Sequence, residues 1–314
     1  MAGMFLLTAA AVSCGKGDLY DPTTRHEVSI AFDWSENPLI DGESDRPTGM
    51  KMHFYPQPTT GTGSTEAEIY EVGPTGGSVN LTMGDYKMLA YNNDTREEVV
   101  HFRNMERFET AEAYVAEATE PTEAMQDAER LPGTKSGGGV VVYQPDRLHG
   151  GVWEGLRVTP EGGASGVVKP IPMVRVIRFD VDVAEIADVA SSEGLLSGVA
   201  SAVNLSTGES VPGSNARTAF SMTKTAKGVV GVVTVFGVNT PDTTGTKDLS
   251  QLKLSFHLND GSVSTVTVDV SKAVEQASGN KIVVNVEVKG LHEMYVTAQV
   301  TGWQSGGDLN IDLI

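Results

Sequence analysis

Hydrophobic and polar positions alternate along the chain in short stretches, and each stretch ends at Gly, Pro, Asn or Asp. In HEVSIAFDW, the apolar residues Val28, Ile30, Phe32 and Trp34 point one way, and smaller or polar residues point the other. A period of two residues predicts a strand with one buried face. The same alternation recurs at residues 49–55, 78–83, 173–183 and 281–288.

The clearest hairpin lies in the C-terminal half, at residues 252–270. Its two alternating runs flank the turn Asn259-Asp260-Gly261, and turns of this composition favour a tight reversal between strands. Residues 228–238 are rich in β-branched side chains, which suit a buried strand.

Residues 103–135 allow two interpretations. Their carboxylates and helix formers fit a helix over 105–118, which Pro121 would limit. A strand at 109–115 followed by an acidic loop fits equally well.

Strands alternating with turns, almost without a βαβ rhythm, predict an all-β protein built from two β-sandwiches. The Gly-, Ser- and Pro-rich stretch 160–172 is the strongest linker signal in the chain. We therefore expect an N-terminal β-sandwich domain over 26–168 and a C-terminal one over 169–314.

Charge narrows the possible partners. The chain has 23 Lys and Arg residues against 41 Asp and Glu residues, a net charge of −18. Such acidity argues against nucleic acid as a partner and against electrostatic binding to anionic lipid, because both need a basic surface.

Cys14 is the only cysteine, so neither an internal disulfide nor a cysteine-based zinc site can form. It follows a short apolar run over residues 4–12 and a small residue, Ser13. This arrangement resembles the lipobox of bacterial lipoproteins, although Ala11 stands where leucine is usual and no basic residue precedes the run. The resemblance implies a signal peptide at 1–13, lipidation at Cys14, a tether at 14–25 and attachment to the outer membrane. The charged residues Lys16 and Asp18 resemble signals for exposure at the cell surface.

Catalytic chemistry leaves no recognisable pattern in the sequence. Phosphate-binding, dinucleotide-binding, metalloprotease and nucleophile-elbow motifs are all missing. The histidines are scattered singly, and the loop 241–248 lacks the Gly and Glu of a calcium loop. We expect Asp180 and Asp182 to be surface residues on one strand face. The sequence thus predicts a non-enzyme without catalytic residues, cofactor or metal.

Tryptophan placement bears on carbohydrate binding, which uses exposed aromatic platforms. Trp34 is in phase with a buried strand face, so we expect it in the core. Trp153 and Trp303 fit a core or rim position better than an exposed platform.

Several stretches resemble the fimbrillin superfamily of cell-surface lipoproteins, which includes the shaft, anchor and accessory subunits of type V pili. They are VSIAFDWSENP, GMKMHFYP, LTMGDYKMLAYNND, RVIRFDVDV, LLSGVASAVNLSTGE and VTGWQSGGDLNIDLI, in this order along the chain. The residues that match the superfamily pattern are Cys14, Gly84, Tyr86, Tyr91, Asn92, Asn93, Asp94, Gly198, Gly208 and Trp303. The resemblance implies two transthyretin-like, Greek-key β-sandwich domains.

The superfamily also implies a mode of assembly. In its shaft subunits, a protease cuts after Arg or Lys and removes the first strand, and a strand of a neighbouring subunit fills the groove. Here Arg25 precedes the first strand and Arg46 follows it, but Pro47 disfavours cleavage after Arg46. An uncut first strand would suit an anchor or accessory subunit.

The sequence therefore predicts a lipid-anchored, fimbria- or adhesion-associated surface protein that joins other fimbrial subunits by strand addition. The alternative is a glycan-binding lipoprotein of a polysaccharide-uptake system. Aromatic residues exposed on one face would favour that alternative.

Overall fold

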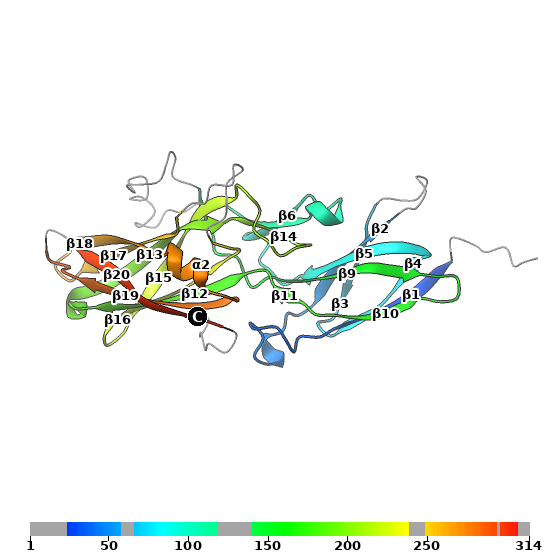
Figure 1. Ribbon diagram of the computed structural model, residues 1–314, viewed down its shortest axis with the longest axis horizontal. Coiled ribbons are helices and arrows are strands. Elements are labelled where there is room, and N and C mark those ends of the chain that lie inside the picture. Colours follow the sequence, from blue (N-terminus) through cyan, green and yellow to red (C-terminus); the bar gives the residue numbers. More distant parts are fainter. Residues whose placement is uncertain (1–23, 58–65, 119–139, 239–248, 294–295, 307–314) are drawn as a thin grey trace, which may run out of the picture.

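Strands dominate the computed structural model, which describes residues 24–57, 66–118, 140–238, 249–293 and 296–306. The molecule is elongated, and its N-terminal and C-terminal halves follow one another along the long axis (Figure 1). Helical structure in the described residues is confined to single turns and the short helix α2 (Ser271–Gln276). The predicted all-β class is confirmed.

Two facing sheets form the N-terminal half. In the described residues, the smaller sheet has three strands in the order β10 (Ala164–Val168), β1 (Arg25–Phe32) and β4 (Gly76–Thr82). The larger has the order β11 (Ile171–Pro172), β9 (His149–Val158), β5 (Gly84–Asn92), β2 (Met50–Pro56) and β3 (Glu68–Val72). Buried apolar residues of both sheets, among them Ile30, Phe54 and Leu81, form one core between them.

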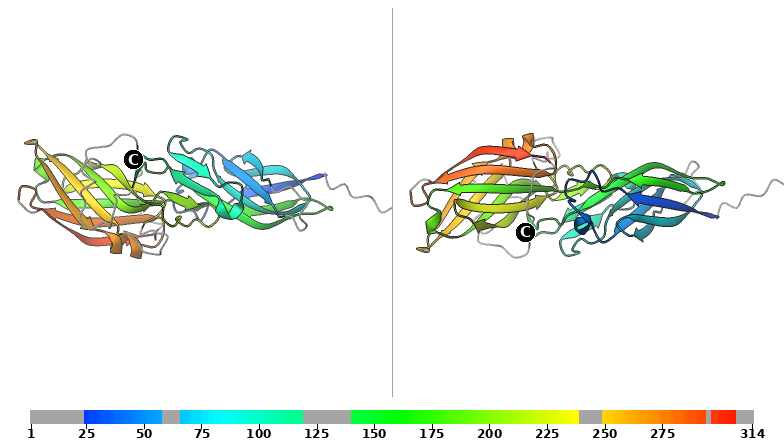
Figure 2. Two further views of the ribbon diagram at one scale, coloured as in Figure 1. Left: turned by 90° about the horizontal axis from the view of Figure 1, so that it is seen from above. Right: turned by 90° about the horizontal axis from the view of Figure 1, so that it is seen from below.

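One long sheet builds the C-terminal half. Its described strands run in the order β18 (Val263–Asp269), β17 (Gln251–Leu258), β13 (Val189–Ala200), β15 (Asn215–Lys224), β16 (Gly228–Val235), β12 (Arg175–Val183), β19 (Lys281–Lys289) and β20 (Thr297–Ser305). The sheet curls around its core so that β18 and β20 approach each other (Figure 2). The alternation predicted for residues 281–288 holds, because Ile282, Val284, Val286 and Val288 are all buried.

Between the halves, strands from one half pair with strands from the other. The short strands β6 (Val100–Arg103) and β7 (Glu112–Val115) pair with each other, and β7 also pairs with β14 (Ala202–Asn204). β8 (Val141–Val142) joins the long sheet through β15. The second hydrophobic core accordingly runs from Tyr55 and Tyr91 in the N-terminal half into the C-terminal sheet.

The helix predicted as one alternative for residues 105–118 is wrong. The chain forms only a 3₁₀ turn, η2 (Phe108–Thr110), and then β7. Ala113 and Val115 are buried with period two while β6 and β14 supply backbone partners, so tertiary pairing overrides the helix propensity of the segment. The acidic loop expected after this strand lies mostly outside the described residues.

The hairpin predicted for residues 252–270 is confirmed. β17 and β18 form the expected hairpin, and the amide of Gly261 donates to the carbonyl of Leu258 at 3.0 Å in the turn. The glycine of the L-S-G stretch, Gly198, has φ +67° and sits where the register of β13 shifts between Ser197 and Val199. A positive φ suits glycine, so Gly198 creates a β-bulge in that strand.

Candidate functional site: the first strand and its surroundings

β1 lies in the middle of its sheet and is hydrogen-bonded on both edges. It runs antiparallel to β4, with Arg25 opposite Thr82, and parallel to β10, with Val28 opposite Ala164. Val28, Ile30 and Phe32 enter the N-terminal core from one face of the strand. The alternation seen in the sequence thus produces a strand that is held by its backbone and by its side chains.

Two glycines let the neighbouring backbone approach β1 closely. Gly76 has φ +112°, and a Cβ atom at this position would collide with the carbonyl oxygen of Ile30. A Cβ atom on Gly163 would collide with the carbonyl oxygen of Glu27. The groove around β1 is therefore shaped by backbone on both sides, and a side chain at either glycine would push the strand out.

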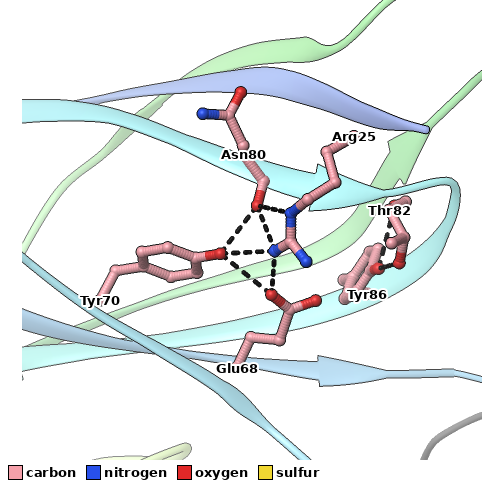
Figure 3. Close-up of polar contacts among 6 residues, drawn as sticks. All are labelled: Arg25, Glu68, Tyr70, Asn80, Thr82 and Tyr86. Atoms are coloured by element: carbon pink, nitrogen blue, oxygen red, sulfur yellow. Dashed lines mark hydrogen bonds and ion pairs between the residues drawn. The ribbon is translucent and has the colours of Figure 1, made fainter. Parts of the chain in front are cut away.

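At the beginning of β1, Arg25 connects the two sheets (Figure 3). Its guanidinium donates to the carbonyl oxygen of Asn80 on β4 at 3.0 Å, to the hydroxyl of Tyr70 on β3 at 2.7 Å, and to the carboxylate of Glu68. The Tyr70 hydroxyl also lies 2.7 Å from the Asn80 carbonyl. These contacts cover the outer edge of β4, which the sheet leaves without a strand partner among the described residues.

Charge complementarity strengthens this cluster only moderately. The hydrogen bond to Glu68 is the largest cause of the raised pKa of Arg25. Desolvation by burial is the largest cause of the raised pKa of Tyr70, whose hydroxyl stays protonated. The Arg25 side chain is 43% exposed, so solvent screens the ion pair and its net contribution stays within about 1 kcal/mol.

Arg46, which follows the first strand, is enclosed by fixed backbone. It ends the 3₁₀ turn η1 (Glu43–Asp45), and its amide donates to the carbonyl of Glu43 at 3.3 Å. The carboxylate of Asp45 accepts the amides of Asp41 and Gly42, both at 3.1 Å. Beyond it, Pro47 is buried and the amide of Thr48 donates to Asp94 at 2.9 Å.

The Y-N-N-D block, residues 91–94, organises the inner end of the N-terminal half. Asn92 is buried; its side-chain oxygen accepts the amide of His149 at 2.6 Å, and its amide donates to Asp94 and to the carbonyl of Arg147. Tyr91 packs against Phe102.

Two further matched residues lie at the opposite end of β5. The Tyr86 hydroxyl bonds to Thr82 across the turn that Gly84 permits. Like the Y-N-N-D block, these residues fix the ends of strands and form no reactive centre.

Gly208, which also matches the superfamily pattern, shapes a turn of the backbone. Gly208 occupies a turn at φ +72°, where the Asn204 side chain accepts the amides of Ser206 and Thr207. Cys14 and the loop 241–248 lie outside the described residues.

The tryptophans do not gather on one face. Trp34 is buried, as predicted, and its indole donates to the carbonyl of Pro74 at 2.7 Å. Trp153 is half-buried against the N-terminal core beside Gly166. Trp303 is 36% exposed on β20 in the other half, with the ammonium of Lys272 5.9 Å from its ring centre. An aromatic platform shared by these residues is excluded.

In the described parts of the chain, titratable groups do not form a metal site. Among the described residues, no three His, Cys, Asp or Glu side chains are close enough together to hold a metal ion. Asp180 is half-buried rather than fully exposed, and it accepts a 2.8 Å hydrogen bond from Arg178 on its own strand. Asp182 is exposed, as expected.

Sequence reasoning missed the partners of Arg25. Glu68, Tyr70 and Asn80 lie 43 to 55 residues away along the chain. Glu68 and Tyr70 occupy alternate positions of one strand, so the sequence predicts that they share a face of that strand. It does not show which residue packs against this face.

In the part of the chain that the structure describes, no helix is long and apolar enough to cross a membrane.

The chain is an all-β protein of the β-sandwich type, and its first strand lies in the middle of a sheet. The family described as a domain of unknown function, DUF5119, matches residues 13–221, which is more than half of the chain. The protein belongs to this family. A comparison with curated proteins finds no match.

Solved structures share the fold over nearly the whole chain. A proposed adhesin from Bacteroides ovatus ATCC 8483 is 21% identical with a TM-score of 0.61, covering 88% of this chain and 94% of that one. A proposed polysaccharide-binding protein (DUF1812) from Bacteroides thetaiotaomicron is 10% identical with a TM-score of 0.55, covering 88% and 96%. The fimbrial anchor protein Mfa2 from Porphyromonas gingivalis is 12% identical with a TM-score of 0.50, covering 89% and 98%. At these identities the likeness concerns the fold.

Proposed function

We propose that this protein is a lipid-anchored, cell-surface subunit of a fimbrial or adhesive assembly, and that it acts as an anchor or accessory subunit of the fimbrillin type. Lipidation at Cys14 would attach it to the outer membrane, and other fimbrial subunits would join it by strand addition. The fold shared with a fimbrial anchor and with a proposed adhesin supports this role.

The observation that carries the proposal is the way β1 is held. The strand is bonded on both edges, its apolar side chains are part of the core, and Arg25 is bound by three partners at its start. A shaft subunit must lose its first strand to accept a neighbour. A strand this firmly held fits a subunit that keeps both its strand and its lipid.

The fixed geometry around Arg46 supports the same conclusion and leads to a prediction. A protease needs an extended chain, so cleavage here requires local unfolding of the turn. We expect the Pro47→Ala variant to resist an arginine-specific protease after Arg46 while folded, and to be cut there once unfolded in urea. Mass spectrometry of the fragments measures both states.

The wild-type chain is the control for this experiment, because Pro47 protects it in both states. Rapid cleavage of folded Pro47→Ala after Arg46 would show that proline alone, and not the turn, blocks the protease. The first strand would then be removable.

The assembly role is tested in cell envelopes. We expect envelopes solubilised without boiling to show a heat-labile ladder that contains this protein, with acylated Cys14 as its N-terminus. The Cys14→Ala variant is expected to be lost from the membrane fraction. A ladder whose subunits begin beyond Phe32 would make the protein a shaft subunit, and a single monomer band with intact lipid would contradict assembly altogether.

A further inference from the structure

A polar pocket of about 310 Å³ lies at the inner end of the N-terminal half. Arg46 at the end of η1 and Arg147 just before β9 line it together with three aspartates, Asp45, Asp94 and Asp146. Every lining residue belongs to the described parts of the chain, and neither β1 nor the Arg25 cluster contributes. The volume is at the lower end of the range for small-molecule sites, so it suits a ligand of about one sugar ring or one amino acid.

The carboxylates of this pocket already accept hydrogen bonds from the chain itself. Asp45 accepts two backbone amides at 3.1 Å, and Asp94 accepts the amide of Thr48 at 2.9 Å. Asp146 accepts the amide of Arg96 at 2.7 Å and its Nε at 2.9 Å. These bonds fix all three aspartates in place and use the guanidinium of Arg96.

The other two guanidinium groups of the pocket lack such partners. Nε of Arg46 is buried without a hydrogen-bond acceptor in the described chain, and its one ion pair is a 3.8 Å contact with Glu43, whose side chain is 90% exposed. Within the described residues, the side chain of Arg147 has no hydrogen bond or ion pair, although its carbonyl accepts from Asn92. Both arginines are half-buried. Donors in this position gain free energy when a ligand supplies an acceptor.

His149 closes the inner end of the pocket with an uncharged ring. Its pKa falls to about 4, chiefly through burial and then through the positive charge of Arg147, which outweighs the opposite effect of Asp94. At this end of the pocket the cation therefore has a stronger influence than the carboxylate. The ring itself stays neutral at physiological pH and adds no charge to the site.

The balance of charges favours an anion with a single charge. With Arg96 paired to Asp146, the guanidiniums of Arg46 and Arg147 stand against Asp45 and Asp94. Two negative charges on one ligand would be repelled by these aspartates. The remaining acidic residues of the chain count less, because salt screens charges that lie more than about 8 Å away. A carboxylate carries one charge, and its two coplanar oxygens match the donor fork of a guanidinium.

We propose that this pocket binds the carboxylate of a small organic acid between the guanidinium groups of Arg46 and Arg147. Two guanidiniums that lack acceptors, aspartates that are already occupied and a volume of one small ring together define this ligand. Sugar acids and acylated amino acids share the required chemistry. The inference goes beyond the proposed function, because it names a ligand and depends neither on lipid nor on assembly.

The test is isothermal titration of the full chain, carrying Cys14→Ser to keep it unacylated, with D-glucuronate, D-galacturonate and N-acetyl-L-alanine. We expect at least one of these acids to bind and its uncharged amide not to bind. Binding by the sugar acids alone or by N-acetyl-L-alanine alone identifies the source of the carboxylate. Sulfate, with two charges, is expected to bind more weakly than the acid.

Two variants locate the site. We expect Arg147→Gln and Arg46→Gln each to weaken binding of the acid about tenfold, the usual effect of losing a hydrogen bond between charged groups. Arg107→Gln is the matched control, since Arg107 is an exposed arginine that does not line the pocket, and it should bind like the parent chain. The side chain of Arg147 supports no other residue in the described chain, so Arg147→Gln should keep the parent melting temperature.

Arginine modification tests the same site without any substitution. Phenylglyoxal reacts with accessible guanidinium groups, and we expect the bound acid to slow its reaction with Arg46 and Arg147 but not with Arg107, as measured by peptide mass spectrometry. Absence of binding by all three acids would overturn the proposal. So would equal binding of acid and amide, binding that both variants leave unchanged, or sulfate binding as tight as that of the acid. A loss of assembly in envelopes would leave all these outcomes unaffected.

Discussion

Acidification from pH 7 to pH 4 is expected to remove about 3 kcal/mol of unfolding free energy for each of the two buried histidines, His53 and His149. Burial is the largest cause of the lowered pKa of both side chains, which falls from 6.5 to about 4. At neutral pH both rings are uncharged in the folded and in the unfolded chain. Below pH 6.5 the unfolded chain takes up the protons first, so stability falls with pH until the folded rings titrate near pH 4.

The contacts of the two rings explain why they stay neutral. The side-chain amide of Asn37 donates to Nδ1 of His149 at 3.0 Å, so that nitrogen must keep its lone pair. His53 lies between the rings of Tyr55 and Tyr91, with its Nε2 3.1 Å from the Tyr91 hydroxyl. A proton on either ring would place a charge in an apolar environment.

Urea unfolding at pH 7, 6 and 5 measures this effect in a window where carboxylates, with ordinary pKa values near 4, contribute little. His149→Gln is expected to start from a lower stability and to lose about half as much free energy as the parent chain over this range. The same loss in the parent and in His149→Gln would show that His149 is protonated within the folded chain and is not a source of acid sensitivity.

Replacing Ile30 by aspartate is expected to destabilise the N-terminal half by about 4 kcal/mol or more, because the carboxylate would be buried without a partner. Ile30 is 3% exposed and belongs to the core between the two sheets. The neighbouring residue on the opposite face, Ala31, is exposed, so Ala31→Asp should cost less than about 1 kcal/mol, the range of strand propensity. Comparing the stabilities of Ile30→Asp and Ala31→Asp isolates the effect of burying a carboxylate within one strand.

Denaturant unfolding and trypsin digestion together measure this difference. We expect Ile30→Asp to release β1 and to expose the bond after Arg25 to trypsin, whereas Ala31→Asp keeps it protected. Equal stability of the two variants would mean that β1 is not packed into the core as described. The proposal of a firmly held first strand would then be contradicted.

The sequence by itself determined the class of the fold and the face of most strands. Period-two patterns fix which side chains are buried wherever one face of a sheet meets a core, and the residues of β1 and β19 follow this rule. The turn at Gly261 is also readable locally, because backbone conformations with positive φ favour glycine. These features depend on residues a few positions apart.

Only the tertiary structure determined which strand or side chain each buried face packs against. The parallel pairing of β1 with β10 joins residues more than 130 positions apart, such as Val28 and Ala164. The Arg25 cluster likewise brings together segments that share no local pattern. For residues 105–118 local helix propensity even pointed to a wrong alternative. The physical reason is that alternation shows how much of a strand is buried, whereas the choice of partner follows from the packing and hydrogen bonding of the whole chain.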